Sequence, residues 1–242
     1  MNLWGISDVG AVRSQNQDAY YITEPGAAYP FGLVCDGMGG AKAGNVASTM
    51  AVETFATTLL DALAGPVKPE MEGLLEKAVE LANELVRYRS EVDVDCQGMG
   101  TTLVAALVEP ELVRLVNVGD SRGYRVSPEG IFQITRDHSV VSDLVERGEI
   151  TREEARSHPK KNLITRALGA EAAVQADHFT LERRAGELIL LCSDGLSNVV
   201  TDQELLFELL HGGPLEGACR RLLDLALSRG APDNVTAVLI EL

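Results

Sequence analysis

Four aspartates in this chain stand at the ends of apolar runs that have the length of β-strands. Asp36 and Asp194 close two such runs, Asp120 follows a third, and Asp233 precedes the last. Each is next to a glycine or an asparagine, residues that let the backbone turn sharply and approach a ligand. One aspartate of this kind is an ordinary turn residue. Four of them indicate carboxylates that converge on a hard cation such as Mg²⁺ or Mn²⁺, which prefers oxygen ligands.

The elements that must position these aspartates come in blocks along the chain. Apolar runs predict strands at 3–7, 19–22, 31–35, 101–109, 111–119, 123–126, 130–135, 174–181, 187–192 and 235–241. Helical periodicity predicts helices at 43–63, from about residue 70, at about 201–210 and at 214–228. Blocks of strands separated by pairs of helices indicate an α+β fold with layered sheets rather than an alternating parallel sheet.

A polar segment of helical character, residues 139–161, interrupts the strands. Two segments, 151–154 and 201–204, fit the capping box that opens a helix. The chain has no internal repeat, linker or low-complexity stretch. We therefore expect a single domain over residues 1–242, with an insertion at about 139–165.

Composition excludes several classes of protein. The chain of 242 residues is 45% hydrophobic and carries a net charge of −15, which argues for a folded domain and against nucleic acid or an anionic membrane as partner. It has no apolar run of the roughly 20 residues that cross a bilayer and no signal peptide pattern, so we expect a cytoplasmic protein. None of its cysteines has an arginine six positions later, which excludes the loop of a thiol-based phosphatase. The cysteines are Cys35, Cys96, Cys192 and Cys219.

Eight motifs occur in order between residues 7 and 238. They are SDVGAVRSQNQD, VCDGMGG, MGTT, NVGDSRGYRV, TRDHS, NLITRALG, LCSDGLSNVV and APDNVTAVL. Together they resemble the metal-dependent protein phosphatases, the PPM or type 2C serine/threonine phosphatases, in their short bacterial form. The resemblance implies a four-layer αββα sandwich, in which two antiparallel sheets are flanked by helix pairs, and this agrees with the order of elements above.

The resemblance also implies a role for each aspartate. Asp36 is expected to bridge two metal ions, Mn²⁺ or Mg²⁺, and Gly37 to offer its backbone carbonyl to one of them. Asp194 and Asp233 are expected to complete the second ion. Mg²⁺ and Mn²⁺ keep several waters, so few protein ligands are needed.

Three further assignments follow from the resemblance. Asp120, with Asp194, is expected to hold a third, weaker ion found in bacterial members. Asp18 is expected to accept hydrogen bonds from metal-bound waters. Arg13 is expected to bind the phosphate oxygens, a task suited to a planar group with several donors.

The activity implied is hydrolysis of phosphoserine and phosphothreonine in proteins. Two metal ions about 3.5–4 Å apart can activate a water for in-line attack without a covalent intermediate. The expected substrates are phosphoproteins of a serine/threonine kinase in signal transduction, and the expected state is a monomer. Two alternatives remain open: an inactive member that only binds, which would be expected to lack a ligand, and a phosphoesterase of small molecules.

One residue departs from many eukaryotic relatives. They carry a histidine two positions after the bridging aspartate, proposed as the general acid, where this chain has Met38. Methionine cannot donate a proton. The identity of the acid is therefore open, and a metal-bound water is the best candidate.

The remaining polar residues of the motifs receive no role in the site. Asp8 and Asp137 are interpreted as turn residues, His138 as a packing residue or helix cap, and His158 as a surface residue. In contrast, the segment 147–166 has six basic and three acidic residues, a net charge of +3 in an acidic chain. By resemblance it is the flap beside the active site, and its charge suggests selection of acidic phosphoprotein substrates. The basic residues are Arg147, Arg152, Arg156, Lys160, Lys161 and Arg166, and the acidic ones are Glu149, Glu153 and Glu154.

Overall fold

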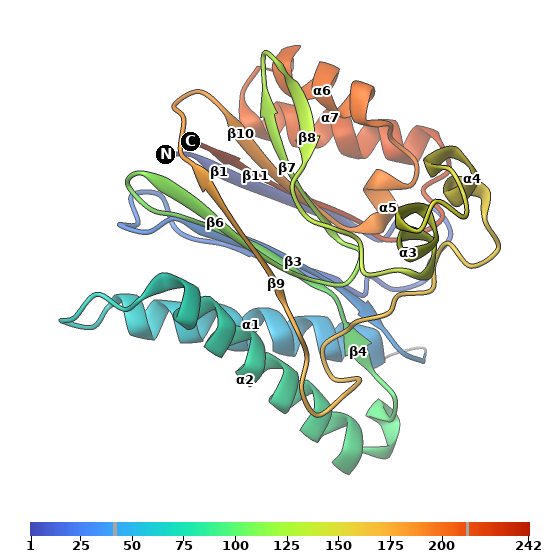
Figure 1. Cartoon of the computed structure of the whole chain (residues 1–242), viewed down its shortest axis with the longest axis horizontal. Coiled ribbons are helices and arrows are strands. Elements are labelled where there is room, and N and C mark those ends of the chain that lie inside the picture. Colours follow the sequence, from blue (N-terminus) through green and yellow to red (C-terminus); the bar gives the residue numbers. More distant parts are fainter. Residues whose placement is uncertain (41–42, 212) are drawn as a thin grey trace.

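Two antiparallel β-sheets pack face to face, and a pair of helices covers the outer face of each (Figure 1). The structure is a computed structural model that describes residues 1–40, 43–211 and 213–242. The four layers confirm the predicted α+β sandwich. None of the described helices is both long enough and apolar enough to cross a membrane.

The first sheet has five strands, which lie in the order β1, β11, β10, β7, β8. They are β1 (Leu3–Asp8), β11 (Val235–Glu241), β10 (Leu188–Cys192), β7 (Arg122–Ser127) and β8 (Gly130–Gln133). The second sheet runs β2, β3, β5, β6, β9, with β4 paired to β3. They are β2 (Asp18–Ile22), β3 (Phe31–Met38), β4 (Gly100–Thr101), β5 (Leu103–Val108), β6 (Leu112–Val118) and β9 (Asp177–Glu182).

The helices fall into two layers and one insertion (Figure 1). On the second sheet lie α1 (Ala43–Leu63) and α2 (Met71–Val92), followed by the short 3-10 helix η1 (Val94–Cys96). On the first sheet lie α6 (Asp202–His211) and α7 (Leu215–Ser228), next to the short α5 (Asp194–Ser197). Between β8 and β9, the segment 139–165 carries α3 (Val140–Glu146) and α4 (Arg152–Ser157).

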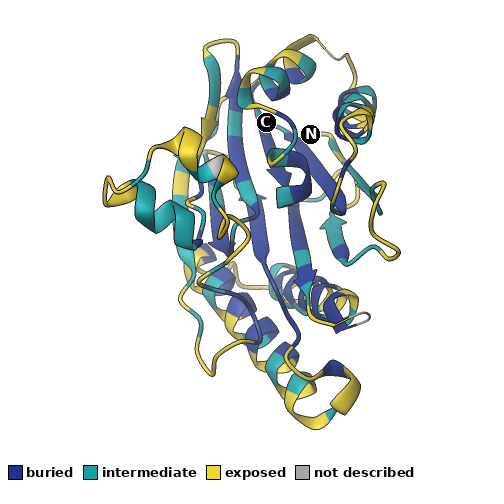
Figure 2. Ribbon diagram, turned by 90° about the vertical axis from the view of Figure 1, so that its right-hand side faces the viewer, coloured by how far each residue is buried: buried dark blue, intermediate teal, exposed yellow. Residues whose placement is uncertain are grey.

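The core forms three apolar clusters, one between the sheets and one under each helix pair. Figure 2 shows the buried residues concentrated in the central strands. All six residues of β5 are buried, because one face of the strand meets the helices and the other meets the opposite sheet. A strand buried on both faces has a continuous apolar run instead of alternation, and this explains why such runs identified the strands.

Several bounds of elements differ from the sequence prediction: the strand expected at 31–35 extends to Met38, and the strand expected at 130–135 ends at Gln133. The run at 101–109 divides into β4 and β5, and the strand expected from 174 begins at Asp177.

Of the two predicted capping boxes, the first is complete, because Thr151 forms the full capping box with Glu154. The second predicted box is only half formed: Thr201 donates its N–H at 2.9 Å and its hydroxyl at 2.7 Å to Glu204 Oε2. The hydroxyl does not accept the Glu204 N–H, which donates to the Thr201 carbonyl at 3.0 Å instead.

Candidate functional site

The predicted aspartates come from both sheets and meet at one end of the sandwich. Asp36 lies near the end of β3, and Asp18, at the start of β2, is its partner in the strand register. Asp120 follows β6, and Asp194 is the first residue of α5, just after β10. Asp233 precedes β11, the strand that pairs with β10. The two sheets thus assemble carboxylates that are up to 215 residues apart in the chain.

Crowding of these carboxylates is visible in the pKa of Asp36. Burial raises the pKa of this carboxyl well above its ordinary value, and the charges of Asp18, Asp194, Asp120 and Asp233 raise it further. Each of those four charges therefore lies close enough to oppose ionisation of Asp36. Such a group of carboxylates is stable as anions only when cations neutralise it.

Three further carboxyls of the site, those of Asp18, Asp120 and Asp194, show the same effect. Burial is the largest cause in each case: it raises the pKa of Asp120 to about 8 and that of Asp18 to about 6, and it raises the pKa of Asp194. The charge of Asp194 adds to the shift at Asp120, and the charge of Asp233 adds to that at Asp194. Asp36, Asp120 and Asp194 nevertheless keep part of their surface open to solvent, so a cation can reach them.

Asp18 is held rigidly from the opposite sheet. Ser193 Oγ and Thr236 Oγ1 both donate to its Oδ2, at 2.7 and 2.6 Å. Its other oxygen, Oδ1, is buried and has no hydrogen-bond partner among the described residues. Buried carboxylate oxygens normally have a partner. An oriented carboxylate with one oxygen that lacks a hydrogen-bond partner fits the expected role of Asp18 towards metal-bound water.

The glycines that follow two of the aspartates are required by close backbone contacts. A Cβ on Gly37 would lie 2.0 Å from the carbonyl oxygen of Gly44, in the first turn of α1. A Cβ on Gly195 would lie 1.9 Å from the carbonyl oxygen of Asn234. The absence of a side chain therefore lets α1 and the 233–234 turn pack directly on the strand ends that carry Asp36 and Asp194.

Arg13 lies beside Asp233, and its Nη2 is 2.7 Å from Asp233 Oδ2. Its side chain is 51% exposed, so the group remains accessible to a ligand. The loop that carries Arg13 is fastened by Asn234, whose Nδ2 donates to the Val9 and Gln15 carbonyls, each at 2.9 Å. Its Oδ1 accepts from the Gln17 N–H at 2.8 Å. The sequence prediction gave Asn234 no role, although it belongs to the APDN motif.

The donor chemistry of the site fits Mg²⁺ or Mn²⁺. Within the described residues, no group of three or more His, Cys, Asp or Glu side chains is arranged to hold a metal ion unaided. The acidic groups instead surround one another at the strand ends, and all their donors are oxygens. This suits hard ions that complete their coordination with water.

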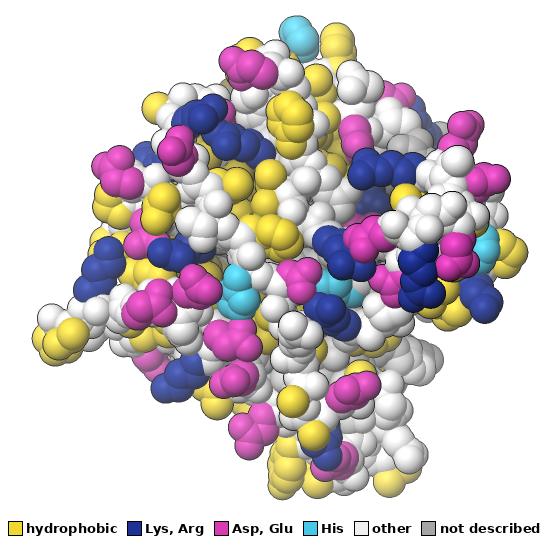
Figure 3. Space-filling model, viewed as in Figure 1, with side chains coloured by type: hydrophobic (Ala, Val, Ile, Leu, Met, Phe, Trp, Pro, Cys, Tyr) yellow, Lys and Arg dark blue, Asp and Glu magenta, His cyan; other side chains and the backbone are white. Residues whose placement is uncertain are grey.

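A cavity of about 600 Å³ extends from Asp120 and Asp194 towards the insertion. Its wall combines apolar residues of β8 and α3, such as Phe132 and Val145, with basic residues including Lys161. In Figure 3, Lys and Arg side chains stand among Asp and Glu over the insertion, at the right of the view. The insertion is therefore next to the site, as expected, and its surface is mixed in charge.

Similarity to known proteins covers nearly the whole chain. A family model described as Protein phosphatase 2C matches residues 11–227. The "Serine/threonine phosphatase stp" of Listeria monocytogenes serotype 4b (strain F2365) is 39% identical over 235 residues, which cover 97% of this chain and 93% of that protein.

Two solved structures show that the similarity extends to the fold. The crystal structure of the Mycobacterium tuberculosis serine/threonine phosphatase PstP/Ppp has a TM-score of 0.89 at 40% identity, covering 100% of this chain and 98% of that one. A catalytic domain of serine threonine protein phosphatase PstP in complex with 2 manganese ions has a TM-score of 0.85 at 38% identity, covering 99% and 97%.

Proposed function

The chain belongs to the protein phosphatase 2C family, and we propose that it is a serine/threonine protein phosphatase that uses metal-activated water. The observation that carries the proposal is the group of four aspartates whose charges surround Asp36 and raise its pKa. A divalent cofactor is supported by the family and by the manganese complex of a structural neighbour.

The residues divide into two roles towards the metal ions. Asp36 and the Gly37 carbonyl, with Asp194 and Asp233, would hold two ions, and Asp120 with Asp194 a weaker third. When bound, the ions lower the pKa of water so that it attacks phosphorus and no enzyme nucleophile is needed. Asp18 would orient a water through Oδ1, the carboxylate oxygen that has no hydrogen-bond partner among the described residues.

Arg13 would bind the phosphate of the substrate. The contact with Asp233 uses Nη2 of the guanidinium and places the group at the edge of the carboxylate site. A guanidinium has five N–H donors, so others remain for phosphate oxygens. Arg13 thus contributes binding and orientation, which are most of what a protein must supply in phosphoryl transfer.

The proton for the leaving serine or threonine oxygen needs another source than Met38, the last residue of β3. A thioether has no proton to give. Water held at Asp120 is the source that we favour, because Asp120 lies in the cavity that adjoins the site.

The finer expectations from the sequence belong to the same proposal. They are a single catalytic domain over 1–242, substrates of a serine/threonine kinase, a monomer, a cytoplasmic location, and Mn²⁺ or Mg²⁺ in two core positions and one weaker position. A binding-only relative is disfavoured, because every expected acidic ligand is present. A small-molecule phosphoesterase is the alternative that the assay must separate.

A substrate panel tests the proposal. With Mn²⁺ present, phosphoserine and phosphothreonine peptides should be hydrolysed with higher kcat/KM than nucleotides or sugar phosphates. Preference for a small phosphate ester would replace the protein phosphatase with a metabolic phosphoesterase. Equal rates with and without divalent metal would remove the metal-activated water.

A further inference from the structure

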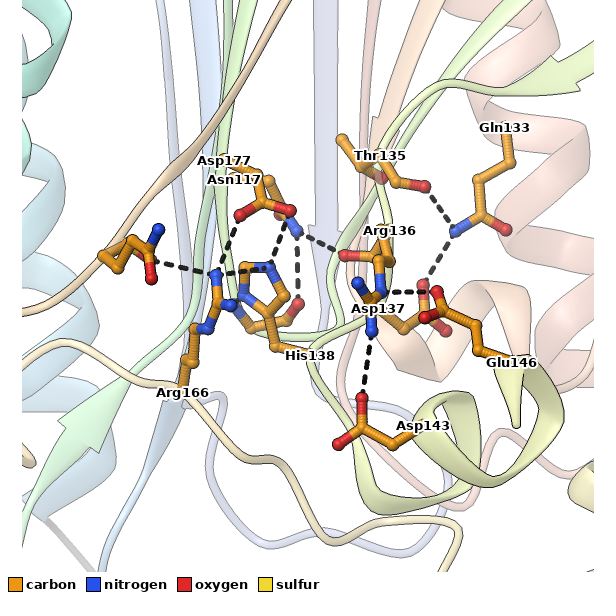
Figure 4. Close-up of polar contacts among 12 residues, drawn as sticks. Asn117, Gln133, Thr135, Arg136, Asp137, His138, Asp143, Glu146, Arg166 and Asp177 are labelled. Carbon is orange, nitrogen blue, oxygen red and sulfur yellow. Dashed lines mark hydrogen bonds and ion pairs between the residues drawn. The ribbon is translucent and has the colours of Figure 1, made fainter. Parts of the chain in front are cut away.

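Two consecutive residues, Asp137 and His138, hold the turn that carries Asp120, although neither has a role in the function above. They stand where the chain enters the insertion, and His138 is 3% exposed. Figure 4 shows their side chains within a network of polar contacts. His138 contacts Gly119, and Asp137 contacts Arg122. Asp120 lies between these two anchoring points in the chain.

The contact of His138 with Gly119 is double. His138 Nδ1 accepts from the Gly119 N–H at 3.1 Å, and the His138 N–H donates to the Gly119 carbonyl at 2.9 Å. Asn117 Nδ2 donates to the same carbonyl at 3.2 Å. Gly119 has φ of +105°, and a Cβ there would lie 2.6 Å from Thr102 Cγ2. Both the N–H and the carbonyl of Gly119, the residue just before Asp120, are therefore held by hydrogen bonds.

The second ring nitrogen of His138 faces Asp177 on β9. Its Nε2 lies 3.2 Å from Asp177 Oδ2, and Arg166 donates to Asp177 Oδ1 at 2.8 Å. Because Nδ1 accepts from Gly119, the neutral ring must carry its proton on Nε2 and donate to Asp177. Arg166 Nη1, which can only donate, also lies 3.2 Å from Nε2, and its partner is Asp177 Oδ1. Asp177 Oδ2 is the acceptor that favours the tautomer that Gly119 requires.

Asp137 fixes the other end of the turn. Arg122 donates to both its carboxylate oxygens, from Nε at 3.0 and 3.1 Å and from NH2 at 2.7 Å. Such a forked pair is stronger and more directional than a single hydrogen bond. The turn 119–122 therefore cannot shift without breaking contacts at one of its ends.

We propose that His138, oriented by Asp177, is a positioning residue for Asp120: its ring holds the N–H of Gly119 so that the Asp120 carboxylate is set for its cation. The inference rests on the proposed role of Asp120 as a metal ligand. It assigns the histidine of the TRDHS motif a function through Gly119 and no contact with substrate.

Two substitutions separate the two ring nitrogens. In His138→Asn, the amide oxygen can replace Nδ1 as the acceptor for Gly119. In His138→Gln, the longer amide can reach Asp177 but leaves the Gly119 N–H without its partner. Calorimetric titration with MnCl₂ should show the weakest ion bound roughly 10- to 100-fold less tightly in His138→Gln. His138→Asn should stay within a few-fold of the wild type.

Kinetics give a second readout. Phosphopeptide hydrolysis by His138→Gln should lose kcat with little change in KM, because Arg13 is untouched. The matched control is His178→Gln. His178 follows Asp177 in β9 and forms a histidine–carboxylate pair with Glu76, which this substitution breaks. It should keep wild-type Mn²⁺ binding. Should His138→Gln fold poorly, Asp177→Ala tests the same contact from the other side and should weaken the same ion.

A double-mutant cycle decides whether His138 acts through Asp120. In an Asp120→Ala background, His138→Gln should cause no further loss, whereas an additional loss would overturn the positioning role. Wild-type Mn²⁺ binding by His138→Gln beside an impaired Asp120→Ala would overturn this inference alone. Full metal binding and turnover by Asp120→Ala would overturn it together with the third ion, while the two-ion function would stand.

Discussion

The carboxylate site and the insertion touch the same cavity but are built differently. The carboxylate site (Asp18, Asp36, Asp120, Asp194 and Asp233) stands at strand ends. Buried hydroxyls hold Asp18, and the backbone beside Asp36 and Asp194 is packed too closely to admit a Cβ on the glycine that follows. The insertion (139–165) rests on two short helices, and α3 has no buried residue. A rigid part of this kind suits chemistry that needs fixed geometry, and an exposed insertion suits contact with variable partners.

The largest effect should come from the centre of the carboxylate site. Asp36→Asn keeps the size of the side chain but removes one of the charges that bind cations, so hydrolysis should fall to background even in excess Mn²⁺. EDTA should abolish wild-type activity, and added Mn²⁺ should restore it. Phosphopeptide hydrolysis by phosphate release measures both. Substantial turnover in either case would contradict a metal mechanism centred on Asp36.

The next effect tests whether rigidity matters as much as charge. Gly37→Ala places a Cβ 2.0 Å from the Gly44 carbonyl oxygen, so α1 or β3 must move. Overpacking of this kind costs roughly 1–3 kcal/mol, and Mn²⁺ binding should weaken together with the melting temperature. The control is Gly40→Ala, where a Cβ meets no described atom within 4 Å. Unchanged stability and metal affinity in Gly37→Ala would mean that the strand end tolerates displacement.

Arg13 stands between the two regions, because it is charged and half exposed but anchored to Asp233. Arg13→Ala removes the phosphate contacts and the hydrogen bond to Asp233 but leaves every carboxylate in place, so Mn²⁺ affinity should stay nearly unchanged and substrate binding should weaken. Loss of a charge-assisted hydrogen bond costs roughly 1.5–3 kcal/mol, or about 10- to 100-fold in kcat/KM. Peptide and p-nitrophenyl phosphate should lose alike. An unaffected kcat/KM on both would leave Arg13 as a surface residue.

The position of the aspartates at strand ends can be predicted from the sequence for a physical reason. Strands buried on both faces give continuous apolar runs, and the aspartates that end them are visible beside those runs, as at Asp36 and Asp194. The layers follow from the order of the runs. The resemblance then adds the roles, which composition and spacing alone leave open.

The supporting contacts could not be predicted in the same way. Asp18 is held by Ser193 and Thr236, from the other sheet, and the Arg13 loop by Asn234. These pairs are far apart in sequence and follow no periodicity. The residue type of a hydroxyl or amide side chain does not reveal which face of a strand it occupies or which residue it contacts. For the same reason the sequence indicates only a packing residue or helix cap at His138, whereas its ring accepts a hydrogen bond from the Gly119 N–H.

The insertion should show the smallest effect, and it tests the division between the two regions. Several of its basic residues are already paired, such as Arg147 with Glu149 and Arg166 with Asp177. Among the described side chains, Lys160 and Lys161 form no ion pair, and Lys161 lines the cavity. The side chain of Arg156 lies outside the described residues. These two lysines, together with Arg152, which also lines the cavity, are thus the cations available to acidic residues that flank a phosphoserine.

Reversing both charges should reduce hydrolysis of acidic phosphopeptides by a few-fold at low salt, and less at higher salt, because exposed charges are screened over about 10 Å at 0.1 M. The variant is Lys160→Glu with Lys161→Glu, and p-nitrophenyl phosphate should be hydrolysed at an almost unchanged rate. Lys77→Glu with Arg220→Glu is the matched control, since both residues are exposed on outer helices and the net charge changes equally. If the control loses as much, the effect belongs to net charge. If the flap variant loses on both substrates, the insertion supports the site itself and the contrast between the two regions fails.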